Sequence, residues 1–145
     1  MAEESRNIMY RINCLTSELD ALYHRAAVRL GLADSDMFLL YLLYEKNGKC
    51  PLSSIRGETG ISKQTVNSAV RKMEREGLIY LEQSGGRAKT ACLTEKGKTF
   101  AENTVARLFA AESGIFNSWS GDEINTYLYL LEKHNNDFLN QIEKM

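Results

Sequence analysis

A cluster of polar side chains suited to DNA contact lies between residues 62 and 72. The apolar residues of this stretch, Val66, Ala69, Val70 and Met73, are spaced to share one face of a helix. The opposite face and its flanks carry Ser62, Lys63, Gln64, Thr65, Asn67, Ser68, Arg71 and Lys72. Amides bind the edges of adenine, and basic side chains bind guanine or phosphate. The pattern therefore predicts a helix that enters the major groove; the alternative is a plain solvated helix face.

Two further basic residues, Arg87 and Lys89, follow a Ser84-Gly85-Gly86 turn. Residues 78–83 and 88–93 are predicted to form short strands on either side of this turn, because the glycines between them are typical of a hairpin. Exposed basic residues on such a hairpin can contact the adjacent minor groove or the DNA backbone. The alternative is two loop cations that contact only water.

The elements that position these residues follow from the apolar spacing and from the residues that begin and end helices. A helix is predicted over 8–30 and stops at Gly31, and another begins at Asp34, Ser35 or Asp36 and ends at Asn47-Gly48. A third runs from Pro51 to Gly60 and a fourth from Ser62 to Gly77. Two helices joined by a tight turn and followed by a hairpin form a winged helix-turn-helix. The predicted fold is mainly α with a small β-hairpin wing.

The C-terminal third is predicted to hold two further helices. Thr94 caps the first, which runs to Trp119, and Ser120 with Glu123 forms a capping box at the start of the second. The first and last helices of the chain carry long apolar stripes that a winged domain of this size does not cover, which predicts a symmetric dimer. Its interface residues are predicted to be Ile8, Ile12, Leu15, Ile124, Leu128, Leu131, Phe138 and Ile142.

Composition and charge narrow the classes of function. The 145 residues include 18 basic and 19 acidic side chains, but residues 52–99 hold nine basic against five acidic ones, so the basic excess lies around the predicted DNA-binding segment. The apolar runs are too short for a membrane span, the first 30 residues do not resemble a signal peptide, and the three cysteines form no pairing motif. We therefore expect a cytoplasmic protein of one domain that has no membrane contact.

The segments "ISKQTVNSAVRKMEREGLI" and "GRAKTACLTEKGK", with "LYLLYEKNG" before them, resemble the MarR (multiple antibiotic resistance regulator) family of winged-helix transcription factors. The resemblance implies a homodimer that binds a pseudo-palindromic operator on double-stranded DNA, with residues 34–93 as the DNA-binding lobe and 1–33 and 94–145 as dimerisation helices. It also implies repression relieved by a small aromatic effector. The family's recognition-helix positions map onto Ser62, Lys63, Gln64, Thr65, Asn67, Ser68 and Arg71, and its wing arginine onto Arg87.

Two positions depart from the family pattern. Gly85 stands where the family's wing commonly carries an aspartate that orients the wing arginine, and Arg56 stands where the third helix usually has a small alanine. These departures leave open how Arg87 is oriented and how the third helix packs.

Alternative functions come from other residue types. Cys14, near the expected dimer interface, would allow thiol-based redox sensing, although a free cysteine in a helix is more often a small apolar residue. A winged helix can also serve as a protein–protein adaptor. No enzyme motif, cofactor site or catalytic residue is expected, and His24 and His134 lack partners at metal-ligand spacing. Six aromatic residues line either an effector cavity or the core: Tyr23, Tyr41, Tyr44, Phe109, Phe116 and Trp119.

Overall fold

The computed structural model describes residues 1–83 and 85–145, without the side chains of Arg56, Glu58 and Thr59. These residues form seven helices and three strands in the order α1 (Ala2–Leu30), α2 (Asp34–Glu45), β1 (Lys49–Pro51), α3 (Leu52–Thr59), α4 (Lys63–Arg75), β2 (Ile79–Gln83), β3 (Lys89–Leu93), α5 (Glu95–Asn103), α6 (Val105–Asn117) and α7 (Gly121–Ile142). They fall into two compact units, 1–108 and 109–145. The predicted fold class, mainly helical with a small winged sheet, is confirmed.

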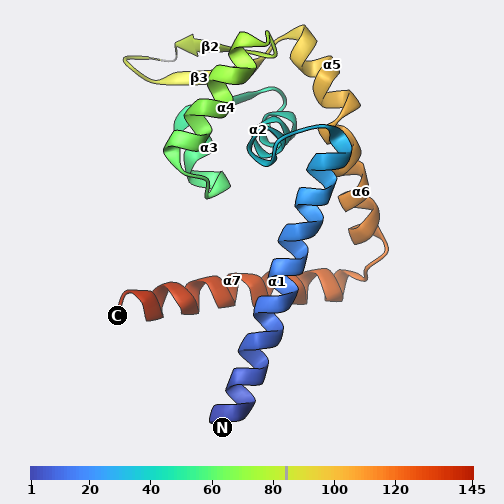
Figure 1. Ribbon diagram of the computed structural model, residues 1–145, viewed down its shortest axis with the longest axis vertical. Helices are drawn as coiled ribbons and strands as arrows, with labels where there is room; N and C mark the ends of the chain where they lie inside the picture. Colours follow the sequence, from blue (N-terminus) through green and yellow to red (C-terminus); the bar gives the residue numbers. More distant parts are fainter. Residues whose placement is uncertain (84) are drawn as a thin grey trace. The chain divides into compact units, whose positions relative to one another are not determined.

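The core of the first unit surrounds α2, which packs against α3, α4 and α5 (Figure 1). Met37, Leu40 and Leu43 of α2 are almost completely buried, and Ile55 of α3 and Met73 of α4 join them. α4 packs against this core through one face, because the four apolar residues predicted to share that face are all buried. The polar side of α4 is therefore directed away from the core.

The sheet has a third strand that the sequence pattern did not predict. β1 pairs antiparallel with β3, which lies in the centre of the order β1-β3-β2. Only Cys50 of its three residues is buried, and a strand this short contains no run of alternation from which to predict it. The predicted hairpin is present as β2 and β3, paired from Ile79 with Leu93 to Gln83 with Lys89.

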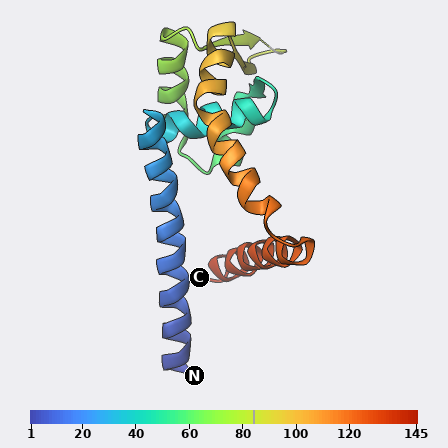
Figure 2. The same cartoon turned by 90° about the vertical axis from the view of Figure 1, so that its right-hand side faces the viewer.

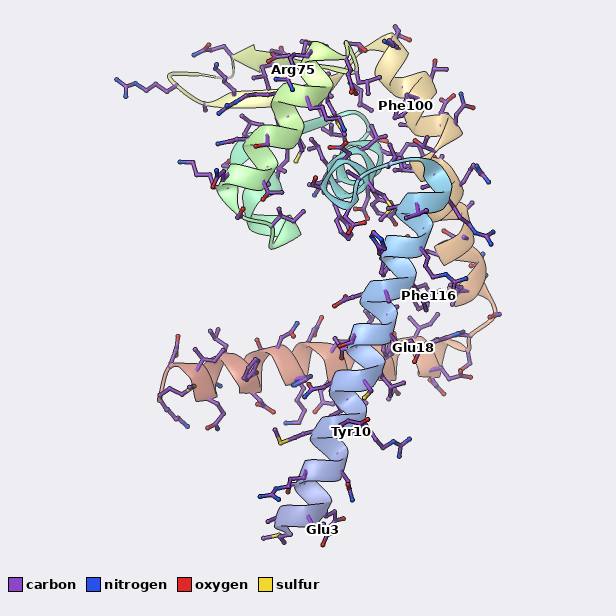
Figure 3. All side chains as sticks on the ribbon, in the orientation of Figure 1. Glu3, Tyr10, Glu18, Arg75, Phe100 and Phe116 are labelled. Carbon is purple, nitrogen blue, oxygen red and sulfur yellow. The ribbon has the colours of Figure 1, made fainter. Side chains whose placement is uncertain are left out.

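Helix α1 begins earlier than predicted and ends where predicted. Gly31 has a φ of 71°, the left-handed conformation of a helix C-cap, and its amide donates to the carbonyls of Ala27 and Val28 in the last turn. Ala27 is buried, and Tyr23, Ala26 and Leu30 pack against the core, so only this end of α1 belongs to the winged lobe. The N-terminal part projects away from the rest of the first unit (Figure 2). Tyr10, on the projecting part, is exposed (Figure 3).

The helix predicted from Thr94 to Trp119 is two helices, so this prediction was wrong. Thr104 interrupts it with φ −125° and ψ −88°, and its buried hydroxyl donates to the carbonyl of Phe100 over 2.6 Å. Apolar spacing did not reveal the break because the residues on either side keep helical periodicity. The start of α2 also differs from prediction: Ala33 holds the cap position and makes no side-chain hydrogen bond, although Asp34 and Asp36 do place negative charge in the first turn.

The second unit contains most of α6 and all of α7. The predicted capping box is present, since Ser120 Oγ accepts from the amide of Glu123 and donates to its Oε1, both over 3.1 Å. The ring of Trp119 makes edge contacts with Phe116 and Tyr127, with centroids 5.2 and 5.5 Å apart. These contacts fasten the α6–α7 turn.

Candidate nucleic-acid interface

The N-terminus of α4 is organised by hydroxyl side chains. Ser62 is the N-cap, and its Oγ accepts from the amide of Thr65 and donates to the Thr65 hydroxyl over 2.8 Å. Ser68 Oγ donates to the carbonyl of Gln64 within the same helix. The three hydroxyls that were predicted to contact DNA therefore all bond within α4, and those of Ser62 and Thr65 organise its first turn. Their contact with DNA stays a prediction.

The longer polar side chains of α4 lie at its surface. Lys63, Gln64 and Arg71 are exposed, and Asn67 is half-buried. A helix buried along Val66 and Val70 leaves this side facing outward, as the sequence predicted. Two cations and two amides therefore follow one another along the open side of the helix, which is the set of groups that reaches base edges and phosphates.

A hollow of about 420 Å³ separates α4 from the wing. Asn67 and Arg71 line it from α4, Arg87 and Lys89 from the wing, and Ser53 from α3. The hollow thus brings together residues predicted separately from the helix and from the hairpin. Three basic side chains around one concave surface concentrate positive potential there, which attracts polyanions.

The wing tip is closed by hydrogen bonds that the sequence did not predict. Gln83 Nε2 donates to the carbonyl of Gly86 over 2.5 Å, and the amide of Ala88 donates to the carbonyl of Gly85 over 3.2 Å. Gly85 has a φ of 81°, a left-handed conformation that suits glycine. The departure from the family pattern at this position therefore fits the local backbone. The turn residue Ser84 and the side chain of Arg56, both noted in the sequence, lie outside the described residues.

Lys72 differs from its neighbour Arg71. Its Nζ lies 2.5 Å from Oδ2 of Asp36, and the Asp36 side chain is only 8% exposed. The hydrogen bond with Asp36 and its negative charge raise the pKa of Lys72. The ammonium that was predicted to contact DNA is thus already paired with a carboxylate of α2, while a phosphate contact by Lys72 stays a prediction.

The C-terminal end of α4 is fastened to the start of α5. Thr94 Oγ1 accepts from the amide of Gly97 and donates to the carbonyl of Gly77 over 2.6 Å, and Lys96 Nζ donates to the carbonyl of Glu76 over 2.8 Å. A Cβ on Gly97 would lie 1.9 Å from the carbonyl oxygen of Leu78. The "LTEKG" segment therefore holds α4, the wing and α5 together; the sequence had predicted the strand that ends at Leu93 and the cap by Thr94.

A second polar cluster lies on the outer face of the sheet, where the sequence predicted nothing. Glu82 Oε2 lies 3.2 Å from Lys49 Nζ and accepts a hydrogen bond from the Cys92 thiol over 3.4 Å. These two bonds and the charge of Lys49 lower the pKa of Glu82. Burial, with the nearby carboxylate, raises the pKa of Cys92, which therefore is not activated as a thiolate.

The residues that carried alternative predictions are dispersed. Cys14 is exposed on α1. At about 100° per residue it lies about 120° around the helix from Ile8, and therefore to one side of the apolar stripe that was predicted to form the dimer interface. His24 Nδ1 contacts Asp34 Oδ1 over 2.9 Å. Within residues 1–83 and 85–145, no three histidine, cysteine, aspartate or glutamate side chains lie close enough to hold a metal. No helix in this part of the chain has the length and apolar character needed to cross a bilayer.

The aromatic and interface residues divide clearly. Tyr23, Tyr41 and Tyr44 pack against the core, whereas Phe109 and Phe116 are exposed. Of the residues predicted at a dimer interface, Ile124 is half-buried and the rest are exposed in the single chain: Ile8, Ile12, Leu15, Leu128, Leu131, Phe138 and Ile142. An interface that covers them remains a prediction.

Two helices joined by a tight turn, followed by a wing of antiparallel strands, define a winged helix-turn-helix protein. Residues 30–89, which run from the end of α1 to the start of β3, match the model of the MarR family. Members of the family regulate transcription and are not enzymes. No curated protein sequence matches the chain.

Solved structures extend the likeness in fold to the remaining helices. The MarR family transcription regulator SP03579 is 17% identical, with 100% of this chain and 99% of that chain covered and a TM-score of 0.73. A MarR family regulator from Silicibacter pomeroyi is 20% identical, with 88% and 86% covered and a TM-score of 0.68. The organohalide-sensing regulator RdhR-CbdbA1625, solved with 2,4-dichlorophenol, is 16% identical, with 92% and 80% covered and a TM-score of 0.64.

Proposed function

We propose that this protein is a homodimeric transcriptional repressor that recognises a pseudo-palindromic operator through α4 and the wing. The observation that carries the proposal is the basic hollow between them, because Arg71, Arg87 and Lys89 converge there from two elements. A duplex seated on this surface meets cations from two directions while the exposed part of α4 enters the major groove. Phosphate contacts then set the register and groove contacts supply sequence preference.

Within α4 the polar residues divide into two roles. Gln64 and Asn67 are the proposed base contacts, because amides pair with adenine in the major groove. Lys63, Arg71, Arg87 and Lys89 are the proposed phosphate or minor-groove contacts. Ser62, Thr65 and Ser68, whose hydroxyls bond within the helix, are proposed to contact DNA from the same surface. Because a two-fold dimer presents two copies of α4, the half-sites are expected about 34–36 Å apart.

The dimer is supported by the apolar faces of α1 and α7. Leu128 and Phe138 of α7 are 51% and 60% exposed in the single chain, and the stripe of α1 is likewise open to solvent. Exposed apolar faces of this length are unfavourable in water and are typical of association surfaces. A second copy covers them symmetrically and gives the two recognition helices that a palindromic site requires.

A small aromatic effector completes the proposal. A solved structure with the same fold contains 2,4-dichlorophenol, which supports a phenolic ligand for this protein as well. We expect at least one member of a panel of substituted phenols to raise the melting temperature and to weaken binding to DNA. A panel without any such compound would remove the effector from the proposal but would leave DNA binding intact.

The test of DNA recognition is salt-titrated binding to a duplex selected from a random-sequence library and to a scrambled duplex of the same composition. Gln64→Ala and Asn67→Ala are expected to weaken the selected duplex by about 1–3 kcal/mol per half-site and to reduce preference over the scrambled one. Arg71→Ala and Lys89→Ala are expected to weaken both duplexes alike and to lower the salt slope by about 0.9 for each phosphate that is no longer neutralised.

Lys144→Ala is the matched control, since it removes one charge at the far end of the chain and is expected to change neither preference nor slope. Full affinity and preference in the Gln64 and Asn67 variants would show that α4 does not select the sequence. A wild-type protein that enriches no duplex from the library would overturn the proposed function itself.

Sedimentation of the protein tests the dimer separately. We expect the wild type to be dimeric at micromolar concentration, and Leu128→Glu or Phe138→Glu to shift it to monomers by placing charge in the interface. Asn136→Glu, off the apolar stripe of α7, is the control and is expected to stay dimeric. A stable, folded wild-type monomer would contradict the proposed assembly.

A further inference from the structure

The ion pair between Asp36 and Lys72 joins α4, which carries the proposed DNA-binding residues, to α2, which packs against it. Asp36 lies in the first turn of α2, and Lys72 lies in the last turn of α4. α2 packs directly against α4. The two charged atoms are 2.5 Å apart, and the carboxylate is almost completely enclosed whereas the lysine side chain remains 46% exposed.

Burial gives the two partners unequal roles. A carboxylate that has lost its water requires a cation, because breaking a buried pair leaves an uncompensated charge. Lys72 supplies that cation and a hydrogen bond. Both ends are also placed favourably for helix dipoles, since an acid stabilises the first turn of a helix and a base the last turn. Asp36 therefore holds Lys72 in one place, and with it the C-terminal half of α4.

We propose that Asp36 and Lys72 are positioning residues for DNA recognition. Lys72 pairs with Asp36 and makes no phosphate contact of its own. The pair fixes how α4 is set against α2, and through the helix it fixes where Gln64 and Asn67 present their amides. This inference rests on the proposed function, because it concerns the helix that is proposed to enter the groove. It reverses the role that residue type alone had assigned to Lys72.

Arg71 provides the comparison within the same helix. It carries the same charge one position earlier, is exposed, and lines the basic hollow beside the wing. Lys72 does not line that hollow. Two adjacent cations of α4 therefore have different surroundings, and the salt dependence of DNA binding distinguishes their roles because it counts the phosphate charges that are neutralised.

The experiment compares Lys72→Met, Lys72→Arg, Asp36→Asn, the Asp36→Asn/Lys72→Met double variant and Arg71→Met in the full-length protein. Each variant is titrated against the duplex selected by the wild type at several salt concentrations, and each is melted thermally without DNA. Glu74→Gln, which removes an exposed acid from the same helix, controls for the general gain in attraction when negative charge is lost.

We expect Lys72→Met and Asp36→Asn each to lower the melting temperature by about 5 °C or more, and the double variant to lose less than the sum of the two. Both single variants are expected to bind the selected duplex about tenfold or more weakly, while the salt slope stays unchanged. A tenfold loss corresponds to about 1.4 kcal/mol of binding free energy. Lys72→Arg is expected to restore affinity. Arg71→Met is expected to lower the slope by about 0.9 for each phosphate that is no longer neutralised.

A lower salt slope in Lys72→Met, or tighter binding in Asp36→Asn beyond that of Glu74→Gln, would overturn the inference, because a lysine freed from Asp36 would then be contacting phosphate. Additive melting shifts in the double variant would also overturn it. These results leave the proposed function standing as long as the wild type selects a duplex. Failure of the wild type to select any duplex would overturn the proposed function and this inference together.

Discussion

At Gly97, the addition of a single methyl group is expected to lower the free energy of unfolding substantially. A Cβ added there would lie 1.9 Å from the carbonyl oxygen and 2.9 Å from the carbonyl carbon of Leu78, and both are backbone atoms that a rotamer change does not move. The residue lies in the first turn of α5, three positions after the Thr94 cap. Gly97→Ala must therefore separate α5 from the segment that joins α4 to the wing.

The magnitude follows from two opposing effects. Replacing a helical glycine with alanine favours the helix by about 0.5–1 kcal/mol, whereas forcing an extra methyl group into a packed site costs typically about 1–3 kcal/mol. Because the obstacle here is backbone, we expect the upper part of that range and a net loss of about 2 kcal/mol. That loss is a large part of a domain's stability, roughly a 30-fold change in the ratio of folded to unfolded protein.

Urea unfolding followed by circular dichroism measures this loss, at one protein concentration for all variants because an associating protein is stabilised by mass action. Gly114→Ala in α6 is the matched control, since a Cβ there meets nothing within 4 Å. It is expected to be stabilising by about 0.5–1 kcal/mol. A Gly97→Ala protein as stable as the wild type would refute the packing argument. Equal gains in stability in both variants would show that helix propensity alone determines the effect of the substitution.

Two further predictions concern the polar cluster on the sheet and the thiols. The pKa of Glu82 is lowered, chiefly by the Cys92 hydrogen bond, from an ordinary value of 4.5, so its contribution to stability is present above that value and is lost as the pH falls through the folded pKa. The stability difference between the wild type and Glu82→Gln is therefore expected to shrink in denaturant titrations as the pH falls below about 4.5, and a constant difference would contradict the assignment. Cys14 is exposed whereas Cys50 and Cys92 are buried, so a thiol reagent is expected to label Cys14 alone in the native protein and all three after unfolding; rapid native labelling of Cys92 would show that the sheet face opens.

The features predicted correctly from the sequence are those set by neighbouring residues. Ser62, Thr94 and Ser120 cap helices, as their types and positions indicated, and Gly31 ends α1. The buried face of α4 also follows from a spacing of three and four residues. Each of these features depends on residues within about one turn of the same helix, so it can be predicted from a single sequence.

The features that the sequence did not reveal depend on contacts between distant segments. β1 exists because Lys49–Pro51 pair with the middle of β3, about forty residues later in the chain, and three residues carry no periodicity of their own. The break at Thr104 occurs where a buried hydroxyl bonds back to Phe100. Propensity and spacing describe one segment at a time, and here tertiary contacts decide.

The same reasoning explains why residue type alone does not distinguish the two adjacent cations of α4. Side-chain chemistry assigns Arg71 and Lys72 the same capacity to bind phosphate, and their spacing places both near the polar face. The difference lies in Asp36, which is 36 positions from Lys72 and whose enclosed carboxylate requires a cation. A basic residue that neutralises a buried acid contributes to the position of the recognition helix, whereas one that faces an open hollow contributes to attraction for DNA. Assigning phosphate contacts from residue type therefore requires knowing, for each cation, whether the fold already pairs it with an anion.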